Sequence, residues 1–341
     1  MNTPKDDSQR PQLAEVARRA GVSLATVDRV INRRKGVKDR TRRRVLDAAR
    51  DIGFLSPEDA ARYGAERPLN ITVLLPAGTN PYLRLLGERV KERIGQSGVD
   101  NPFLRCFFIE SFNAAALVEA LHKNAGWSDA IIFFAIEHPE VRNAAAELAA
   151  AGTRLVTIVS DLGNAPEVGH LGLDNRAVGR TAGLLIGRLA KSTSGSVALV
   201  AGSRHYRAHS EREAGFLSIL DEMFPALRVV GMREGHDDAA ENYRHALDLF
   251  EQVPDLVGIY NVGGSSGGIT RAIRERQRET LVFIGHGLTP DTRRALLDGT
   301  VDAIFDLDPD TLIDRAITLL SHPGTRPRPL KLDIYFRENL P

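Results

Sequence analysis

The sequence predicts a small all-α domain followed by a larger two-lobed α/β domain with parallel sheets. Residues 11–55 place apolar residues at helical spacing, whereas from Leu69 onward apolar strands without alternating polarity are separated by amphipathic helices. Such strands are typical of parallel sheets that helices cover on both faces. About ten strands over roughly 270 residues are too many for one compact open sheet, which predicts two lobes.

Composition divides the 341 residues into four segments. They are a disordered leader (1–10), a helical headpiece (11–55), a polar, proline-flanked linker (56–68) and the α/β domain (69–341). The predicted first lobe covers about 69–165 and 307–325, and the second lobe about 166–306 and 326–341.

Three short helices are predicted in the headpiece. Gly21 ends the first and Gly53 the third, because glycine adopts turn conformations that other residues resist. Ser23 and Thr41 are predicted to cap the second and third helices, since a hydroxyl can accept from a free backbone N–H. The expected helices cover about 12–19, 23–32 and 41–52.

The second helix has two different faces. Its apolar stripe, expected to pack on the other helices, is Val27, Val30 and Ile31. The opposite, exposed stripe is Ala25, Asp28, Arg29 and Asn32. A DNA major groove admits one such helix, and an exposed Arg29 can bond guanine bidentately. The basic residues that follow can neutralise phosphates, and they are Arg33, Arg34, Lys35, Lys38, Arg40, Arg42, Arg43 and Arg44.

Charge is distributed unevenly along the chain. Residues 1–50 carry 14 basic and 6 acidic residues, a net charge of +8, whereas the other 291 carry 31 and 38, a net charge of −7. A basic head on an acidic body suggests that the head binds a polyanion. No long apolar run precedes Leu69, and the single cysteine, Cys106, lies within an apolar strand, so a reducing, cytoplasmic compartment is expected.

One ungapped pattern covers the headpiece from about Pro11 to Phe54. It reads Leu13-x-x-Val16-Ala17-x-x-Ala20-Gly21-Val22-Ser23-x-x-Thr26-Val27-x-Arg29-Val30-x-Asn32, and continues as Val37-x-x-x-Thr41-Arg42-x-x-Val45. This pattern resembles the headpiece of the lactose-repressor (LacI/GalR) family. The resemblance implies base contacts from Leu24, Ala25 and Arg29, and phosphate contacts from Ser23, Thr26, Asn32 and Thr41.

Two positions depart from that family pattern. Asp28 replaces a small hydroxyl residue, and its acid would repel phosphates unless it accepts from a cytosine amino group or pairs with Arg29. Tyr63, after the acidic Glu58 and Asp59, stands where the family often has a leucine that wedges into the minor groove. Whether the linker forms a hinge helix therefore stays open.

The α/β domain is expected to alternate strands and helices. The predicted strands are 69–75, 103–109, 130–134, 155–159, 170–173, 197–200, 229–231, 256–260, 282–285 and 303–305. The predicted helices are 82–94, 141–150, 176–189, 239–250 and 269–276. Ligands of parallel sheets bind at the carboxyl ends of the strands.

Polar side chains at those strand ends form the predicted ligand site, which consists of Asn80, Tyr82, Asp161, Arg212, Asn261, His286 and Asp306. Carboxylates, amides and a guanidinium together suit a hydroxyl-rich molecule, because each hydroxyl both donates and accepts. Asp174 and Asn175 are interpreted mainly as a helix cap, and Asp161 is either a ligand contact or a turn residue. His205 and His209 are interpreted as loop residues, because their spacing does not suit zinc.

Across residues 69–337 the order of elements resembles the sugar-binding periplasmic-protein fold, particularly its ribose-type members. The resemblance implies ligand contacts from Asn80, Tyr82, Asn261 and the Arg212 of Ser210-Glu211-Arg212-x-x-Gly215-Phe216, with Asp306 at the lobe hinge. Gly287 departs from it by standing where a sugar-binding Asp is usual, and His286 is the candidate substitute. Ser160 occupies the family's acidic position, with Asp161 offset by one.

These features predict a cytoplasmic, homodimeric repressor that binds a pseudo-palindromic DNA operator and responds to a sugar or polyol, with no cofactor, metal or membrane. Three alternatives stay open: an activator, a sensor of a phosphorylated sugar or other metabolite, and a metabolite-binding protein without a regulatory role. The glycine-rich 263–268 could cradle a phosphate but lacks the Walker lysine. No recognisable triad or acid–base pair supports an enzyme.

Overall fold

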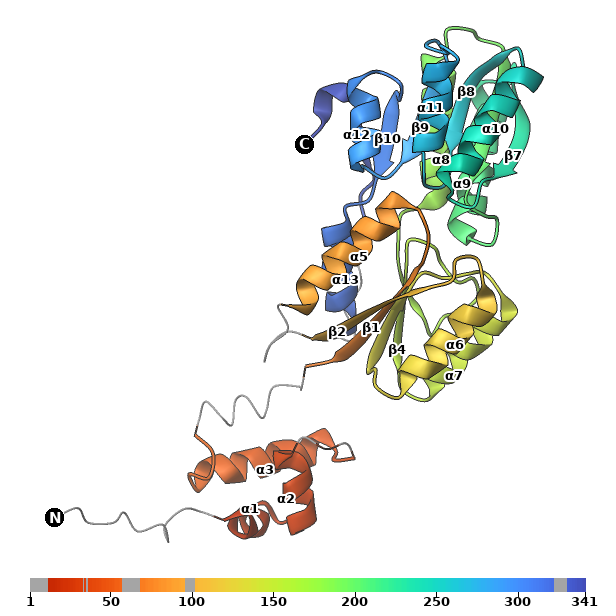
Figure 1. Cartoon of the computed structure of the whole chain (residues 1–341). Coiled ribbons are helices and arrows are strands. Elements are labelled where there is room, and N and C mark those ends of the chain that lie inside the picture. The colour runs from red at the N-terminus through yellow and green to blue at the C-terminus, as the bar shows by residue number, and fades with distance from the viewer. Residues whose placement is uncertain (1–11, 33, 35, 57–67, 96–101, 322–329) are drawn as a thin grey trace, which may run out of the picture. The chain divides into compact units, whose positions relative to one another are not determined.

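The computed structural model describes residues 12–32, 34, 36–56, 68–95, 102–321 and 330–341. The chain separates into two compact units between Pro68 and Leu69 (Figure 1). The predicted leader and most of the predicted linker, including Tyr63, lie outside the described residues. No helix in the described part of the chain is long and apolar enough to cross a membrane.

The headpiece consists of the helices α1 (Leu13–Ala20), α2 (Leu24–Ile31) and α3 (Asp39–Asp51). Gly21 adopts a left-handed conformation, with φ of +61°, and turns the chain from α1 into α2. Ser23 caps α2 by accepting from the backbone N–H of Thr26 at 3.2 Å, as predicted. Thr41 does not cap α3: the last extended residue is Lys38, so the helix begins before Thr41 and includes it in the first turn.

The first lobe of the α/β domain is a five-stranded parallel sheet in the order β2-β1-β3-β4-β5. Its strands are β1 (Asn70–Pro76), β2 (Phe103–Ile109), β3 (Ala130–Phe133), β4 (Arg154–Ile158) and β5 (Gly169–Leu171). One face carries α6 (Ala114–Ala125) and α7 (Pro139–Ala150), and the other carries α5 (Pro81–Ile94) and α13 (Pro309–Ser321) (Figure 1).

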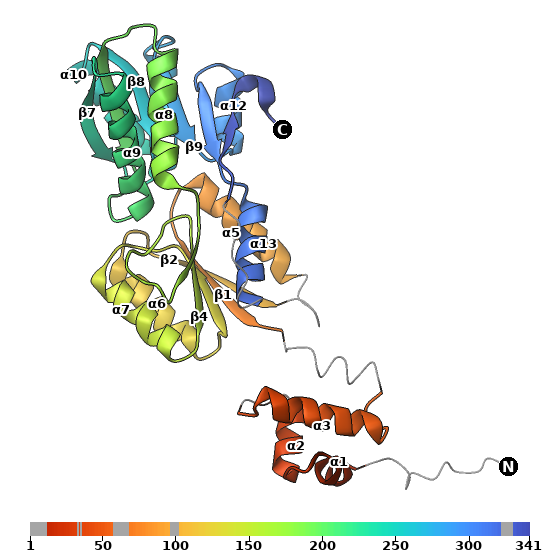
Figure 2. The ribbon, with the colours of Figure 1, turned by 180° about the vertical axis from the view of Figure 1, so that it is seen from behind.

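The second lobe is a six-stranded sheet in the order β11-β10-β9-β8-β6-β7, parallel except for β11. Its strands are β6 (Gly195–Ala201), β7 (Leu227–Glu234), β8 (Leu256–Asn261), β9 (Val282–His286), β10 (Ala303–Asp306) and β11 (Asp333–Tyr335). The helices α8 (Asn175–Leu189) and α9 (Arg207–Met223) lie on one face (Figure 2). The other face carries α10 (Ala239–Gln252) and α11 (Gly267–Glu275), with α12 (Pro290–Leu297) beside them.

The predicted fold class is confirmed, but one predicted lobe limit is wrong. Strand β5 pairs with β4, so the first lobe extends to Leu171 and not only to about residue 165. The chain then passes between the lobes at three places: after β5, after β10 and before β11. Strand β11 was not predicted, because its three residues are too short for a clear strand pattern.

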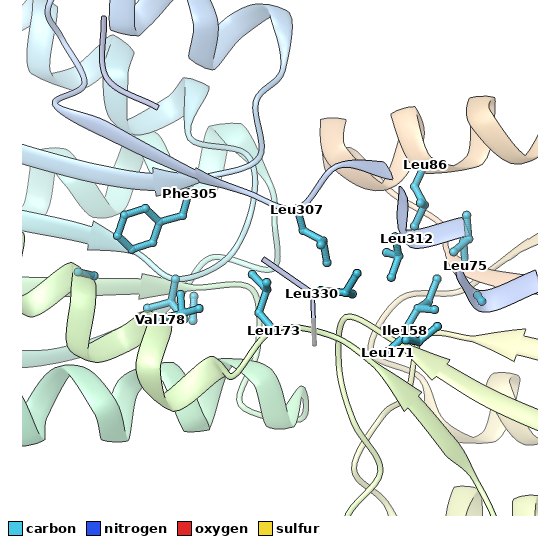
Figure 3. Close-up of a cluster of buried hydrophobic side chains, with 14 of the residues drawn as sticks. Leu75, Leu86, Ile158, Leu171, Leu173, Val178, Phe305, Leu307, Leu312 and Leu330 are labelled. Atoms are coloured by element: carbon cyan, nitrogen blue, oxygen red, sulfur yellow. The ribbon is translucent and has the colours of Figure 1, made fainter. Parts of the chain in front are cut away.

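Three buried leucines join the lobes at these passages. Leu173 lies on the first passage, Leu307 on the second and Leu330 on the third, and all three belong to one apolar cluster (Figure 3). The cluster continues into the first lobe through Leu75 and into the second through Phe305. Apolar burial of this kind stabilises the junction without fixing directional bonds, which suits a hinge.

Candidate ligand cavity and DNA-binding face

A cavity of about 60 Å³ lies where the carboxyl ends of the two sheets face each other. Its polar lining residues are Asn80, Tyr82, His209, Arg212, Asp237, His286 and Asp306. Its apolar lining residues are Leu83, Phe134, Val159, Leu173, Phe305 and Leu307. The volume corresponds to a few water molecules, and the lining combines apolar surface with a small number of convergent polar groups, as ligand pockets do.

Arg212 is buried at the cavity wall and is held by neutral partners. Its Nε donates to Oδ1 of Asn175 at 2.8 Å, and its Nη1 donates to the backbone oxygen of Val262 at 2.8 Å. Burial lowers the pKa of the Arg212 guanidinium below its ordinary value. No carboxylate of the described residues forms an ion pair with it, so the guanidinium remains available to a ligand in the cavity.

The close contact of α8 and α9 fixes the position of Arg212. A Cβ on Gly179 of α8 would lie 1.9 Å from the backbone oxygen of Arg212. Reciprocally, a Cβ on Gly215 of α9 would lie 2.0 Å from the backbone oxygen of Arg176. Because both glycines lack side chains, the helix backbones approach closely enough to bring the guanidinium to the ends of the strands.

Asn80 and Tyr82 enter the cavity from the start of α5. Asn80 caps this helix by accepting from the N–H of Tyr82 at 3.0 Å, and its Nδ2 donates to Oδ2 of Asp237 at 2.9 Å. The hydroxyl of Tyr82 donates to the backbone oxygen of Leu307 at 2.7 Å. Burial raises the pKa of Tyr82 well above its ordinary value, so the phenol stays protonated.

His286 and Asp306 line the cavity from the ends of β9 and β10. The Nε2 of His286 shares a hydrogen bond of 2.8 Å with the hydroxyl of Tyr260, and burial lowers the pKa of the imidazole well below its ordinary value. Asp306 accepts from the N–H of Leu288 at 2.8 Å, and burial raises the pKa of its carboxyl. Because its pKa is lowered, the imidazole of His286 is neutral at pH 7.

Gly287 follows His286 on the cavity wall. Its backbone conformation explains why an aspartate does not occupy this position. Its φ is +80°, which disfavours any other residue, and a Cβ there would lie 3.1 Å from Cβ of Tyr82. An aspartate would therefore be strained and would crowd the tyrosine.

Two predicted ligand residues do not line the cavity. Asp161 accepts from the N–H of Leu162 at 2.6 Å, which is the role of a turn residue. Asn261 is buried and its Nδ2 donates to the backbone oxygen of Gly264 at 2.9 Å and to Oγ of Ser266 at 2.8 Å, so it shapes the glycine-rich loop. Asp174 caps α8 by accepting from Ala177, as interpreted from the sequence.

Two polar residues of the cavity, His209 and Asp237, were not predicted from the sequence. His209 is not a loop residue: it lies in α9, is buried, and shares a hydrogen bond of 2.9 Å with the backbone oxygen of Ser203. Burial lowers the pKa of His209 to about 4. Asp237 follows β7, which was predicted to end at Gly231 but continues to Glu234, so the polar residues after the strand were overlooked.

The exposed face of α2 is as predicted, with one difference in its ion pairs. Val27 and Val30 are buried in the headpiece core, whereas Leu24 is 53% exposed and Arg29 is exposed. The carboxylate of Asp28 does not pair with Arg29. It accepts from Nδ2 of Asn32 at 2.6 Å and pairs with Nη1 of Arg34 at 3.1 Å.

The Asp28 contacts have a consequence for DNA binding. The turn after α2 carries Arg34 back toward Asp28, because the N–H of Arg34 donates to the backbone oxygen of Arg29 at 2.7 Å. Asp28 and Asn32 are thus engaged with the headpiece itself, which leaves Leu24, Ala25 and Arg29 as the freer groups on this face. Arg33, also predicted to contact DNA, lies outside the described residues.

Two family models match the chain. The model of a periplasmic binding protein domain matches residues 71–322, and the model of bacterial regulatory proteins of the lacI family matches residues 12–56.

The first curated relatives match about a quarter of the chain, and one relative matches most of it. The regulator DegA of Bacillus subtilis is 32% identical over 84 residues, and the match covers 25% of this chain and 25% of DegA. An uncharacterised helix-turn-helix regulator of Streptomyces limosus is 27% identical over 292 residues, which cover 81% of this chain and 78% of the relative. The chain thus spans about a quarter of the length of the first relative and most of the length of the second.

A solved structure reproduces the fold of the α/β domain. The glucose-galactose binding protein GanP of Geobacillus stearothermophilus superposes with a TM-score of 0.72 at 20% identity. The superposition covers 80% of this chain and 99% of GanP.

Proposed function

The chain belongs to the periplasmic binding protein domain family through residues 71–322 and carries a domain of the lacI family of bacterial regulatory proteins at residues 12–56. On this premise we propose that it is a repressor whose operator binding is changed by a small hydroxyl-rich ligand. The observation that carries the ligand part is the buried Arg212 at a cavity between two lobes. The ligand acts by binding one conformation better than another, since equal affinity for both would shift nothing.

The DNA part of the proposal assigns the base contacts to α2. Arg29 is exposed and hydrogen-bonds a guanine, and the neighbouring basic residues contact phosphates. Two copies of the chain form a homodimer, whose two-fold symmetry matches a pseudo-palindromic operator.

A neutral sugar or polyol suits the cavity better than a phosphorylated sugar. The glycine-rich loop after β8 could offer backbone N–H groups to a phosphate. However, the N–H of Gly264 already donates to Oδ1 of Asp237 at 2.7 Å, and this carboxylate would repel a second anion. The hydrogen-bonding groups around the cavity suit hydroxyls, which donate to Asp237 and Asp306 and accept from Arg212.

The proposed DNA contacts are tested by selecting the duplexes that the protein binds from a random library. The affinity of the protein is then measured for the selected sequences and for scrambled ones. Arg29→Ala should lower the discrimination between them by roughly 5- to 150-fold, the worth of a bidentate contact to guanine. Arg18→Ala is the matched control, because Arg18 is an exposed arginine of α1 whose partner is Glu15. Equal discrimination by both variants would remove Arg29 from the base contacts, and no enriched sequence at all would refute the regulator.

The ligand part is tested by a thermal-shift screen of sugars, polyols and phosphosugars, since a ligand of the folded state raises the unfolding temperature. The best compound is then added to the operator complex. Arg212→Ala should keep operator binding and lose the response to the compound, whereas Arg228→Ala should keep both, because Arg228 is exposed and pairs with Asp255. A full response in Arg212→Ala would show that the ligand binds elsewhere.

A further inference from the structure

Asp237 makes contacts between the two lobes that the proposed binding of ligand hydroxyls does not explain. It lies between β7 and α10 in the second lobe and is 7% exposed. Its Oδ2 accepts from Nδ2 of Asn80, which belongs to the first lobe, at 2.9 Å. Its Oδ1 accepts from the N–H of Gly264 in the second lobe at 2.7 Å. One carboxylate therefore contacts both lobes.

The backbone of Asp237 makes the same kind of bridge. Its carbonyl oxygen accepts from Oγ1 of Thr79 in the first lobe at 2.9 Å and from Oγ of Ser265 in the second. Asp237 and the preceding His236 both have left-handed conformations, with φ of +53° and +47°. Residues other than glycine adopt such a conformation only where the surroundings hold them, and it is common at functional sites.

Space for the bridge is provided by a glycine. A Cβ on Gly264 would lie 2.3 Å from Nδ2 of Asn80, so any side chain there would push the amide away from Asp237. The first lobe contributes a donor, the second contributes the acceptor, and the glycine allows them to meet inside the cavity.

We propose that Asp237 is a latch that holds the two lobes closed, through the hydrogen bonds of its carboxylate to Asn80 and of its carbonyl to Thr79. Hydrogen bonds to a charged acceptor are the stronger kind, and they strengthen where water is excluded. Since the latch lies on the cavity wall, a ligand that contacts Asp237 also acts on closure. That link to ligand response rests on the proposed function, whereas the closure itself does not.

Two substitutions break the latch from opposite sides. Asn80→Asp keeps the oxygen that caps α5 through Tyr82, but replaces the donor with an oxygen that faces Asp237 and repels it. Asp237→Asn removes the charge from the acceptor. Asp238→Asn is the matched control, because it makes the same charge change one residue along, where the side chain caps α10 by accepting from Glu241 at 2.9 Å.

Opening is measured as the rate at which iodoacetamide modifies a cysteine in the cavity. Leu83→Cys places the thiol at a buried position on the cavity wall, in a Cys106→Ser background that removes the other thiol. The full-length protein is used without DNA or ligand, so the result does not depend on the proposed function. Calorimetry of each variant excludes general unfolding as the cause of a faster reaction.

Both latch variants should react roughly tenfold faster than the parent protein, because Asn80→Asp loses the hydrogen bond and Asp237→Asn loses the charge that strengthens it. Asp238→Asn should react at the parent rate. Asn80→Asp adds a negative charge and Asp237→Asn removes one, so an effect on the thiol alone would move the two rates in opposite directions. The proposal would be overturned if both latch variants reacted at the rate of Asp238→Asn. It would also be overturned if the rate rose in one latch variant and fell in the other.

Discussion

The contact between α8 and α9 makes Gly179→Ala a stringent test of how Arg212 is positioned. The new Cβ would lie 1.9 Å from the backbone oxygen of Arg212, whereas non-bonded heavy atoms settle at roughly 3.5 Å, so the helices must separate by roughly 1–2 Å. Overpacking a dense interior costs about 1–3 kcal/mol, and the better helix propensity of alanine returns up to about 1 kcal/mol. We expect a net loss of about 1–2 kcal/mol, or an unfolding temperature about 2–8 °C lower.

The assay is calorimetry of the full-length protein, with Gly267→Ala as the control. Gly267 is the first residue of α11, and a Cβ there would have no other heavy atom within 4 Å. Its substitution should leave the unfolding temperature of the α/β domain unchanged or slightly raised. If Gly179→Ala unfolds at the temperature of the parent protein, the helices are not in the close contact that we hold responsible for the position of Arg212.

Three further predictions concern the headpiece and the cavity. Ser23→Ala removes the cap of α2 and should destabilise the headpiece by about 1 kcal/mol, seen as a lower temperature for its unfolding transition; an unchanged transition would mean that the cap contributes nothing. Asp28→Ser releases Asn32 and Arg34, so the affinity for random duplex DNA should rise. The slope of log affinity against log salt concentration should steepen by about 0.9 for each additional phosphate that is neutralised. Fluorescence anisotropy measures both, and an unchanged slope would contradict the prediction. Burial lowers the pKa of His209 to about 4, against about 6.5 in the unfolded chain, so between these values the unfolded state binds more protons and the α/β domain loses stability as the pH falls. His209 should contribute about 2 kcal/mol to the loss from pH 7 to pH 5, and buried His286 adds its own contribution. The loss should therefore shrink but not vanish in His209→Gln, whereas equal pH dependence of the two unfolding temperatures would refute the assignment.

The features predicted correctly from the sequence are those set by short-range periodicity. The apolar stripe of α2 and the unalternating strands of both sheets follow from which residues must be buried, and the positions of Gly21 and Ser23 follow from local backbone preference. Arg212 of α9, expected at the ligand site because of its motif, does line the cavity, and its contact with a ligand stays a prediction.

The missed features depend on how separate segments meet. The hydrogen bond between Asp237 and Asn80 joins residues that are 157 positions apart. Residue 237 has a left-handed conformation but is not a glycine, so the sequence gives no sign of this turn. Asp28 was expected beside Arg29 on the same helix face, but its partner is Arg34, which reaches it only through the turn that ends α2. Neither geometry follows from periodicity, because each is fixed by tertiary packing.

The three passages of the chain between the lobes also have a consequence for the gene. Each lobe is built from two separate stretches of the coding sequence, since α13 packs on the first lobe and β11 pairs within the second. A stop codon just after Asp306 would therefore damage both lobes at once, and would take away Leu307 and Leu330 from the junction. To isolate one lobe would require rejoining its two stretches, as in a circular permutation, because no single cut of the reading frame yields either of them whole.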